Sequence, residues 1–440
     1  MRRVAIVSPY FPPSTLAGVH RARLLARHLP AFGWEPVVFC VDERFHEETL
    51  DPGLARLVPA DTRLVKCGAW SSRWLRPLGI GDLSLRGFFA IRRALYAFLE
   101  WEGADALLIT TGPYYTALLG PSVKERFGIP FVLDFQDPWV SRWGATLPVW
   151  SKGGLAHRLA TLLEPRAVRA ADHVVSVSEG ANTELRERYP YLRGDDMSAS
   201  PIGGDPADFN WLRHQPPANQ TVKLEEGAVN LCYVGTFLPR AGRIVDALLG
   251  AAAALRQRRP DLANRLRLIF VGTSNQPDGA GDFRVRDRAG RAGVGDLVQE
   301  TPQRVSYLEA LSILARADGI LLLGSDEPHY TASKIYPAIL SGRPTLGIFH
   351  AASSACRVLR ECGGAIVIDF ADPGDLARRT GDIAHGLETL IDTPERLPPR
   401  NPEAFEPYTA RHVAGEFAAI FERVCDVAGN GRRNAQSAHR

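Results

Sequence analysis

The chain has 440 residues, of which 45% are hydrophobic and 23% charged, and its formal net charge is +3. This composition is typical of a globular protein, and the length favours two domains over one. The near balance of charge gives no reason to expect nucleic acid as a partner. The first apolar run, Val4–Ser8, is too short for a signal peptide and ends in a Pro-rich segment, so we expect a cytoplasmic protein.

The first half of the chain alternates apolar runs with helical patterns. We expect strands at Val4–Ser8, Pro36–Cys40, Ala106–Thr110, Phe131–Phe135 and His173–Ser178. Strands that alternate with helices predict a parallel, doubly wound sheet. Ligands of such sheets bind beyond the carboxyl ends of the strands, which singles out the loops 8–18, 110–115 and 134–139.

Two carboxylates lie at the end of the expected strand Phe131–Phe135. Asp134 and Asp137 could bind hydroxyl groups of a ligand or stabilise a positive charge on it at this sheet edge. The alternative is that one of them caps the next helix, and for Asp134 both interpretations are equally supported. Gln136 lies between them, and because a glutamine cannot act as a general base at neutral pH, its role there would be hydrogen bonding.

The start of the first expected helix adds Gly18, His20 and Arg21 near the same loops. The side chains of His20 and Arg21, like that of Asp134, could meet a ligand at this edge of the sheet. For His20, an ordinary position on an exposed helix face is the alternative that the sequence favours.

The stretch Trp70–Trp101 is rich in aromatic and basic residues, among them Arg73, Arg76 and Arg86. A helix of this kind could lie on a membrane surface and recruit a lipid-linked acceptor. However, Arg92 falls inside its apolar stripe, so a core helix packed on the sheet is the better interpretation.

A second β/α series follows a polar segment that we interpret as a linker at 206–228. Its expected strands are Leu231–Gly235, Leu268–Gly272, Gly319–Leu323, Pro344–Phe349 and Ala365–Asp369. A final helix is expected at about Ala410–Val427, and the remaining residues 429–440 lack apolar periodicity, which predicts a disordered tail.

The segment 324–347 indicates an anion site. A helix follows the run Gly319–Leu323, capped by Thr331 or Ser333, and Lys334 would lie in its first turn beside unpaired backbone N–H groups. A helix N-terminus with an added lysine favours phosphate.

Gly235 and Thr236, followed by Arg240 and Arg243, could form a phosphate loop at the same sheet edge. An ordinary βα turn with solvated arginines is the alternative, but the pairing with Lys334 favours the phosphate loop.

These segments resemble the family-4 type of glycosyltransferases with the GT-B fold. The resemblance rests on Ser333–Tyr336 with Ser341–Pro344 and, in the first half, on Tyr10–Pro13, Gly33–Pro36, Leu133–Trp139 and Val177–Gly180. It covers nearly the whole chain. Two positions depart from the pattern: Pro337 stands where relatives usually carry a glutamate that holds the ribose, and Gln136 where they often carry arginine or histidine.

The resemblance implies an α/β protein with two Rossmann-like, doubly wound domains facing a cleft. The acceptor domain would be 1–205 and the nucleotide-sugar domain 229–405, followed by a closing helix at 406–428 that packs back on the first domain. The implied activity is transfer of a sugar from a nucleoside-diphosphate sugar to an unknown acceptor, with retention at the anomeric carbon.

The implied site residues divide into three groups, of which the first is the expected acceptor-binding set His20, Arg21 and Asp134. We expect catalytic roles for Asp137, Gln136, Lys334 and Arg240. The expected donor-binding residues are Gly18, Gly235, Thr236, Arg243, Gly272, Thr331, Ser333 and Tyr336. No Asp-x-Asp pair occurs, so we expect cationic side chains to hold the diphosphate without metal or another cofactor.

Two alternatives stay open at this point. One is a non-catalytic partner protein that binds a nucleotide sugar, which Pro337 and Gln136 support. The other is a nucleotide-sugar epimerase, which would need placed acid/base groups, and the sequence offers no convincing set of them.

Overall fold

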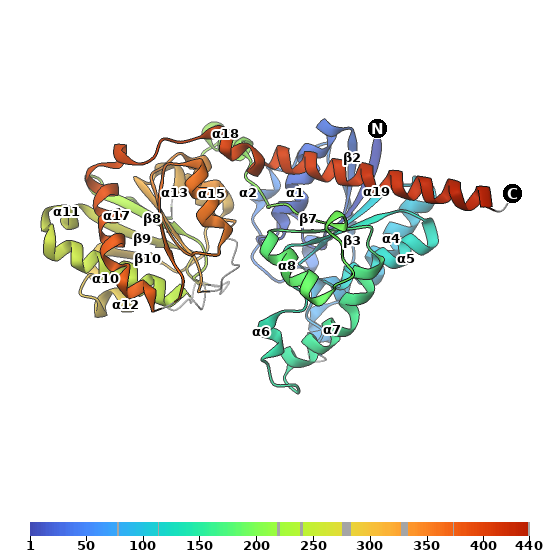
Figure 1. Ribbon diagram of the computed structural model, residues 1–440, viewed down its shortest axis with the longest axis horizontal. Coiled ribbons are helices and arrows are strands. Elements are labelled where there is room, and N and C mark those ends of the chain that lie inside the picture. Colours follow the sequence, from blue (N-terminus) through green and yellow to red (C-terminus); the bar gives the residue numbers. More distant parts are fainter. Residues whose placement is uncertain are drawn as a thin grey trace. The chain divides into compact units, whose positions relative to one another are not determined.

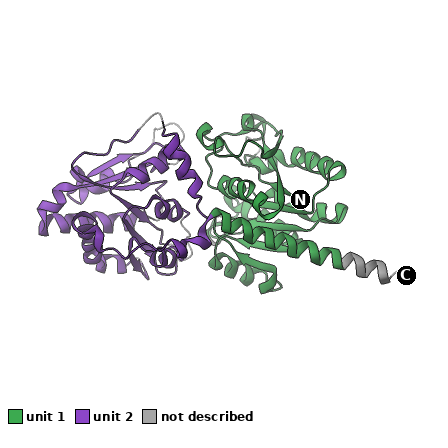
Figure 2. Cartoon of the chain, turned by 90° about the horizontal axis from the view of Figure 1, so that it is seen from above, with its two compact units in different colours: residues 1–202, 410–440 green, residues 203–409 purple. Residues whose placement is uncertain are grey.

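The computed structural model describes residues 1–440 except 77–78, 113, 218–220, 238–240, 275–282, 327–332, 373 and 439–440, and it leaves out the side chains of 142 and 431–438. The chain forms two compact units, residues 1–202 with 410–440 and residues 203–409 (Figure 2). Each unit is a parallel β-sheet with accompanying helices (Figure 1), as expected for an α/β protein.

Unit 1 is a seven-stranded sheet in the order β3-β2-β1-β4-β5-β6-β7. Its strands are β1 (Arg2–Val7), β2 (Trp34–Val41), β3 (Arg63–Cys67), β4 (Ala106–Thr111), β5 (Phe131–Phe135), β6 (His173–Ser176) and β7 (Met197–Ala199). Its helices are α1 (Val19–His28), α2 (Pro52–Ala55), α3 (Ser72–Leu75), α4 (Leu83–Trp101), α5 (Leu119–Phe127), α6 (Arg142–Ala145), α7 (Lys152–Ala170), α8 (Glu179–Arg188) and α19 (Ala410–Ala438).

Both faces of this sheet are covered, which explains why its strands are continuous apolar runs. Ala5 and Val7 of β1 pack into a core with α4, α5 and α7, whereas Val4 and Ile6 point to a second core. That second core contains α1 and Phe417 and Phe421 of α19. The closing helix therefore packs on the first domain, as the resemblance implied.

Unit 2 is a six-stranded sheet in the order β10-β9-β8-β11-β12-β13. Its strands are β8 (Val229–Val234), β9 (Leu266–Val271), β10 (Val298–Thr301), β11 (Gly319–Leu323), β12 (Thr345–His350) and β13 (Ala365–Phe370). Its helices are α9 (Pro206–His214), α10 (Gly242–Arg258), α11 (Pro260–Arg265), α12 (Arg286–Arg291), α13 (Tyr307–Arg316), α14 (Ile335–Ser341), α15 (Ser354–Cys362), α16 (Asp375–Arg378), α17 (Thr380–Asp392) and α18 (Pro402–Phe405).

The structure differs from the expectations where the sequence is polar. Three strands had no apolar run to indicate them: β3, β7 and β10 lie at or next to sheet edges and are short. Helix α9 occupies part of the segment expected as a linker, and the Asp205 side chain caps it. Helix α19 continues to Ala438, so the expected tail is helical over most of its length.

Candidate functional site

The strand order of unit 2 marks where a ligand should bind. Strands β8 and β11 are neighbours, but the chain runs from β8 outward through β9 to β10 and from β11 outward through β12 to β13. The loops that follow β8 and β11 therefore diverge, and in open α/β sheets the crevice at such a switch point is the usual ligand site.

Lys334 lies at this switch point. Its ammonium Nζ is 3.2 Å from the hydroxyl oxygen of Tyr233 and 3.4 Å from the carbonyl oxygen of Thr236, and it lies 4.9 Å from the centre of the Tyr233 ring. Lys334 occupies the N-cap position of α14, one residue after Ser333, and its own side chain makes no capping hydrogen bond. The other expected cap, Thr331, lies outside the described residues. The Lys334 side chain thus joins the start of α14 to the end of β8, although these two segments are far apart in the sequence.

Glycine is required where the lysine crosses the first loop. Gly235 has φ of +140°, and a β-carbon there would lie 2.2 Å from Lys334 Nζ. Gly272, with φ of +73°, follows β9, and a β-carbon on it would lie 3.9 Å from the Gly235 Cα. Two neighbouring strands thus end in glycines; Gly235 is partly exposed beside the lysine, and Gly272 is buried behind it.

The charge of Lys334 is not balanced by a carboxylate of the described residues. No carboxylate within the described ranges lies at ion-pair distance from its Nζ, whose recorded partners are neutral oxygens. Burial, with a smaller contribution from the Arg304 guanidinium, lowers the Lys334 pKa to about 8. A partly buried ammonium beside another cation is a site that an anion would stabilise.

The other expected donor residues are placed unevenly. Thr236 contributes its backbone carbonyl, which also accepts from the Tyr233 hydroxyl at 2.8 Å. Arg243 is exposed in the first turn of α10. Tyr336 is buried and stacks on Tyr408, which is an arrangement of the core. Arg240 and Thr331 lie outside the described residues.

In unit 1 the structure joins two expected acceptor residues to each other. Arg21 Nε is 3.2 Å from Asp134 Oδ2, and both side chains are 0% exposed. The Arg21 guanidinium also donates to the carbonyl oxygens of Ser200 at 2.6 Å and Pro201 at 2.5 Å. Burial raises the pKa of Asp134, while the charge of Arg21 and its hydrogen bond act in the opposite direction. This geometry favours a structural ion pair over an acceptor contact.

The remaining candidates of unit 1 surround that pair. Gln136 Nε2 is 3.4 Å from Asp134 Oδ2, while its buried Oε1 has no hydrogen-bond partner in the described part of the chain. A β-carbon on Gly18 would lie 3.6 Å from that Oε1. His20 is partly buried near Arg23. Asp137 is exposed after β5, so it is the carboxylate of this loop that can meet a ligand.

Three residues of the unit 2 site were not expected. Tyr233 supports Lys334, although its place in an apolar strand predicted a core residue. Arg304 follows β10, a strand that the sequence did not indicate. Glu300 of β10 accepts from the backbone N–H groups of Val285 and Arg286 at 2.9 Å, so it fixes the start of α12. The sequence signal that could have identified Tyr233 as a site residue is its position two residues before Gly235.

Helix α4 lies in the stretch 70–101, for which the sequence allowed either a membrane-surface helix or a core helix. It buries Leu83, Ile91, Leu95, Phe98 and Leu99 against the sheet, so the interpretation as a core helix is confirmed. Arg86 is also buried, where it donates to the Trp70 and Phe45 carbonyls.

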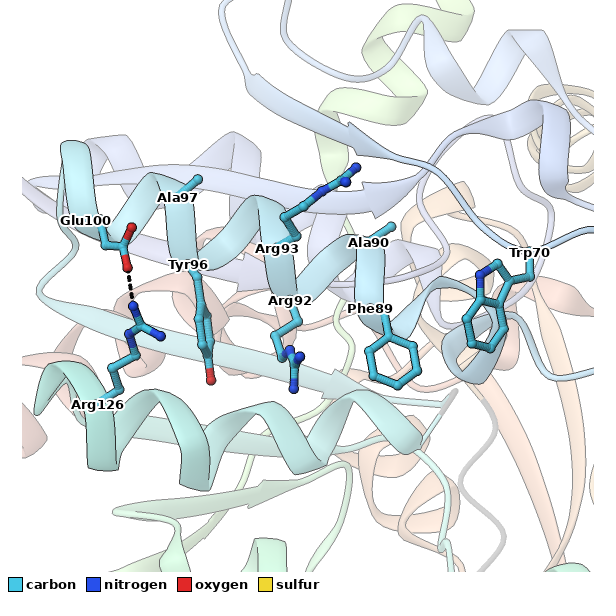
Figure 3. Close-up of a pocket in the computed structure, with 9 residues that line it drawn as sticks. All are labelled: Trp70, Phe89, Ala90, Arg92, Arg93, Tyr96, Ala97, Glu100 and Arg126. Carbon is cyan, nitrogen blue, oxygen red and sulfur yellow. Dashed lines mark hydrogen bonds and ion pairs between the residues drawn. The ribbon is translucent and has the colours of Figure 1, made fainter.

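The outer side of α4 forms an open groove of about 680 Å³ with α5 (Figure 3). Its walls include Trp70, Phe89, Arg92 and Tyr96, and an ion pair of Arg126 with Glu100 closes one end (Figure 3).

Within the described ranges, no helix is both long enough and apolar enough to cross a membrane. Nor do these residues contain a group of three or more His, Cys, Asp or Glu side chains arranged to hold a metal ion.

Comparison with known proteins identifies a domain in the first part of the chain. Residues 18–196 match the glycosyl transferase 4-like domain. The D-inositol 3-phosphate glycosyltransferase of Salinispora arenicola is 26% identical over 289 residues, which cover 62% of this chain and 59% of that protein. The match thus spans less than two thirds of that relative's length.

Solved structures with the same fold extend over nearly the whole chain. Sucrose-phosphate synthase from Thermosynechococcus elongatus aligns with a TM-score of 0.62 at 15% identity, covering 97% of this chain and all of that one. Anabaena HepE in complex with UDP and glucose aligns with a TM-score of 0.59 at 14% identity, covering 96% and 100%. The chain thus carries a glycosyl transferase 4-like domain over residues 18–196, and its two parallel-sheet units have the same fold as these solved structures.

Proposed function

We propose that this protein transfers a sugar from a nucleoside-diphosphate sugar to an acceptor, and that unit 2 binds the donor. The observation that carries the proposal is the Lys334 ammonium at the switch point, held against Gly235 by neutral oxygens. HepE, which shares the fold, was solved with UDP and glucose. A diphosphate beside Lys334 would supply the negative charge that this part of the protein lacks.

The proposed chemistry follows from where charge develops. As the bond between sugar and diphosphate breaks, the leaving phosphate gains negative charge, which a fixed ammonium stabilises more in the transition state than in the ground state. Gly235 and Gly272 would let backbone approach the phosphates, and Arg243 could reach them from α10. Arg240 lies outside the described residues, so its proposed role in stabilising the leaving phosphate rests on the sequence alone.

Unit 1 would then serve the acceptor. Asp137 is the exposed carboxylate of the loop after β5, and Gln136 offers an amide beside the buried Arg21–Asp134 pair. Since glutamine is no general base, we propose that the leaving phosphate takes the acceptor proton in a front-side displacement with retention. The relatives' names point to sugar and polyol phosphates as the first acceptors to test.

The test uses purified protein and a panel of nucleotide sugars, starting with UDP-glucose. Thermal shifts should first identify the donor, because a ligand that binds the native state raises its melting temperature. Release of nucleoside diphosphate, accelerated by an acceptor, would support transfer. Binding without turnover for any acceptor would favour a non-catalytic nucleotide-sugar-binding protein, and an altered sugar on intact nucleotide would favour an epimerase.

Metal dependence is a separate part of the proposal. We expect cations of the protein to hold the diphosphate, so turnover should persist in EDTA. Complete loss of turnover in EDTA that is restored by a divalent ion would contradict this expectation.

A further inference from the structure

Helices α6 and α7 of unit 1 carry an outward apolar surface that the proposed chemistry does not use. Figure 1 shows the two helices together at the lower end of unit 1. We define the α6–α7 face by six residues whose side chains are 40% to 85% exposed: Trp143, Val149, Trp150, Leu155, Leu159 and Leu162. Exposed apolar side chains gathered in one place mark interaction sites more often than scattered ones do.

Helical spacing explains why these leucines share one side. Leu155, Leu159 and Leu162 are four and three residues apart, so they form a single stripe. The opposite side of α7 is buried in the unit 1 core through Ala160, Ala167 and Val168. The helix is therefore apolar on both sides, although only one of them has a partner within the described chain.

Glycines hold the connection between α6 and α7 close to the helices. A β-carbon on Gly154 would lie 2.2 Å from the Pro148 carbonyl oxygen, and one on Gly144 would lie 2.5 Å from His157 Nδ1. The loop that carries Val149 and Trp150 is thereby packed on α7. Trp150, which is 85% exposed, is held outward on this packed loop.

The charges around this face have one sign. Lys152, Arg158, Arg166 and Arg169 are exposed on α7. Between residues 139 and 170 the sequence contains one acid, Glu164, which is fully buried and accepts from Arg188 and Tyr189, each at 2.7 Å. Lys152, Arg158 and Arg166 have no ion-pair partner within the described ranges.

We propose that the α6–α7 face docks on a lipid bilayer that contains anionic headgroups. Leucines flanked by cations on one helix side suit an interface that is apolar below and negatively charged above. Tryptophan is enriched at such interfaces because its ring is apolar and its N–H is polar. This inference concerns binding alone and does not depend on the proposed glycosyl transfer.

The experiment is flotation of the full chain with vesicles. Vesicles of phosphatidylcholine and phosphatidylglycerol at about 2:1 should carry the protein upward, whereas pure phosphatidylcholine vesicles should carry much less, since basic residues are attracted to anionic lipid. Added salt should weaken the binding because it screens these charges. Equal flotation with both lipids, or none with either, would overturn the proposal.

Matched variants locate the contact. Trp150→Ser with Leu155→Ser, and separately Lys152→Glu with Arg158→Glu, should each lower vesicle affinity by at least about tenfold. The control is Trp74→Ser with Trp101→Ser, which changes tryptophans that are 75% and 87% exposed on α3 and α4. This control should bind like the unchanged protein. Loss of binding in the control but not in the α6–α7 variants would place the contact at 70–101 and overturn the proposal.

Two further measurements keep the variants interpretable. All changed side chains are exposed, so melting temperatures should stay near that of the unchanged protein. In the unchanged protein, brominated lipid should quench tryptophan fluorescence, and Trp143→Phe with Trp150→Phe should remove most of this quenching. A dimer in solution that Trp150→Ser dissociates would assign the face to a second copy of this chain instead of lipid.

Discussion

The two units share a strand order, but the cation near the carboxyl end of each sheet has different partners. In unit 1 the Arg21 guanidinium is fully buried and meets Asp134 and two backbone carbonyls. In unit 2 the Lys334 ammonium meets a tyrosine hydroxyl and one carbonyl, and no carboxylate of the described residues approaches it. A cation whose charge is already balanced stabilises a fold, whereas one left with neutral partners is available to a ligand.

The largest expected effect concerns the balanced pair. Asp134→Ala would leave the Arg21 charge buried without its carboxylate, which typically lowers the free energy of unfolding by about 3–5 kcal/mol. Urea denaturation would measure it. The control is Asp137→Ala on the same loop, where exposure predicts a change within about 0.5 kcal/mol. Equal stability of both variants would remove the contrast between the two units.

The second prediction concerns Lys334→Ala. A charge-assisted hydrogen bond is worth about 1.5–3 kcal/mol, so kcat/KM for the donor should fall roughly one to two orders of magnitude. The free energy of unfolding should stay the same or rise, because the substitution removes a partly buried ammonium that no described carboxylate balances. The exposed Lys223→Ala is the matched control. Loss of stability with normal kinetics would show that Lys334 is structural, like Arg21.

The third prediction tests the approach of Lys334 to Gly235. In Gly235→Ala the new β-carbon would collide with the lysine side chain, and the φ of +140° would be strained by about 1–3 kcal/mol. Donor affinity and stability should both fall, as measured by calorimetry and denaturation. Unchanged donor affinity in a folded variant would mean that this glycine does not border the donor.

The smallest effect is on pH dependence. Lys334, with a pKa lowered to about 8, loses its charge as pH rises above that value, so donor affinity should decline there by at most about tenfold per pH unit. The unfolded lysine keeps its proton up to about 10.4. Between these values the unfolded state binds more protons, so this group should add to stability as pH rises.

Donor titrations at several pH values would check the decline in affinity, and urea denaturation over the same range would check the rise in stability. Affinity that is flat across pH 8 would mean that the charge of Lys334 does not contribute to binding.

Sequence reasoning succeeded where apolar runs are continuous. Phe131–Phe135 and Gly319–Leu323 agree with β5 and β11, because strands covered on both faces must be apolar throughout. It missed β10, whose sequence Val-Gln-Glu-Thr lies at a sheet edge and has little to bury. Edge strands are specified by backbone pairing with a neighbour, which one chain segment does not reveal.

The site was predicted in part for a similar reason. Lys334 and Gly235 could be proposed because each follows a strand in a parallel series, and strand ends meet at one edge. Asp134 was placed at the corresponding edge of the unit 1 sheet, but there it pairs with Arg21, which lies 113 residues away in sequence. Which carboxylate is neutralised by a distant cation depends on tertiary packing, and neither residue's neighbours in sequence indicate it.

The central claim is that the Lys334 ammonium receives the donor diphosphate, and proton uptake on binding tests it most directly. UDP should be titrated calorimetrically at pH 8 in buffers of different ionisation enthalpy, with the unchanged protein and with Lys334→Met. Since the pKa of Lys334 is about 8, a bound diphosphate should raise it and draw in about half a proton. We predict this uptake in the unchanged protein, and weaker binding without uptake in the variant. Equal affinity for UDP in both proteins, with no proton uptake in either, would contradict the account.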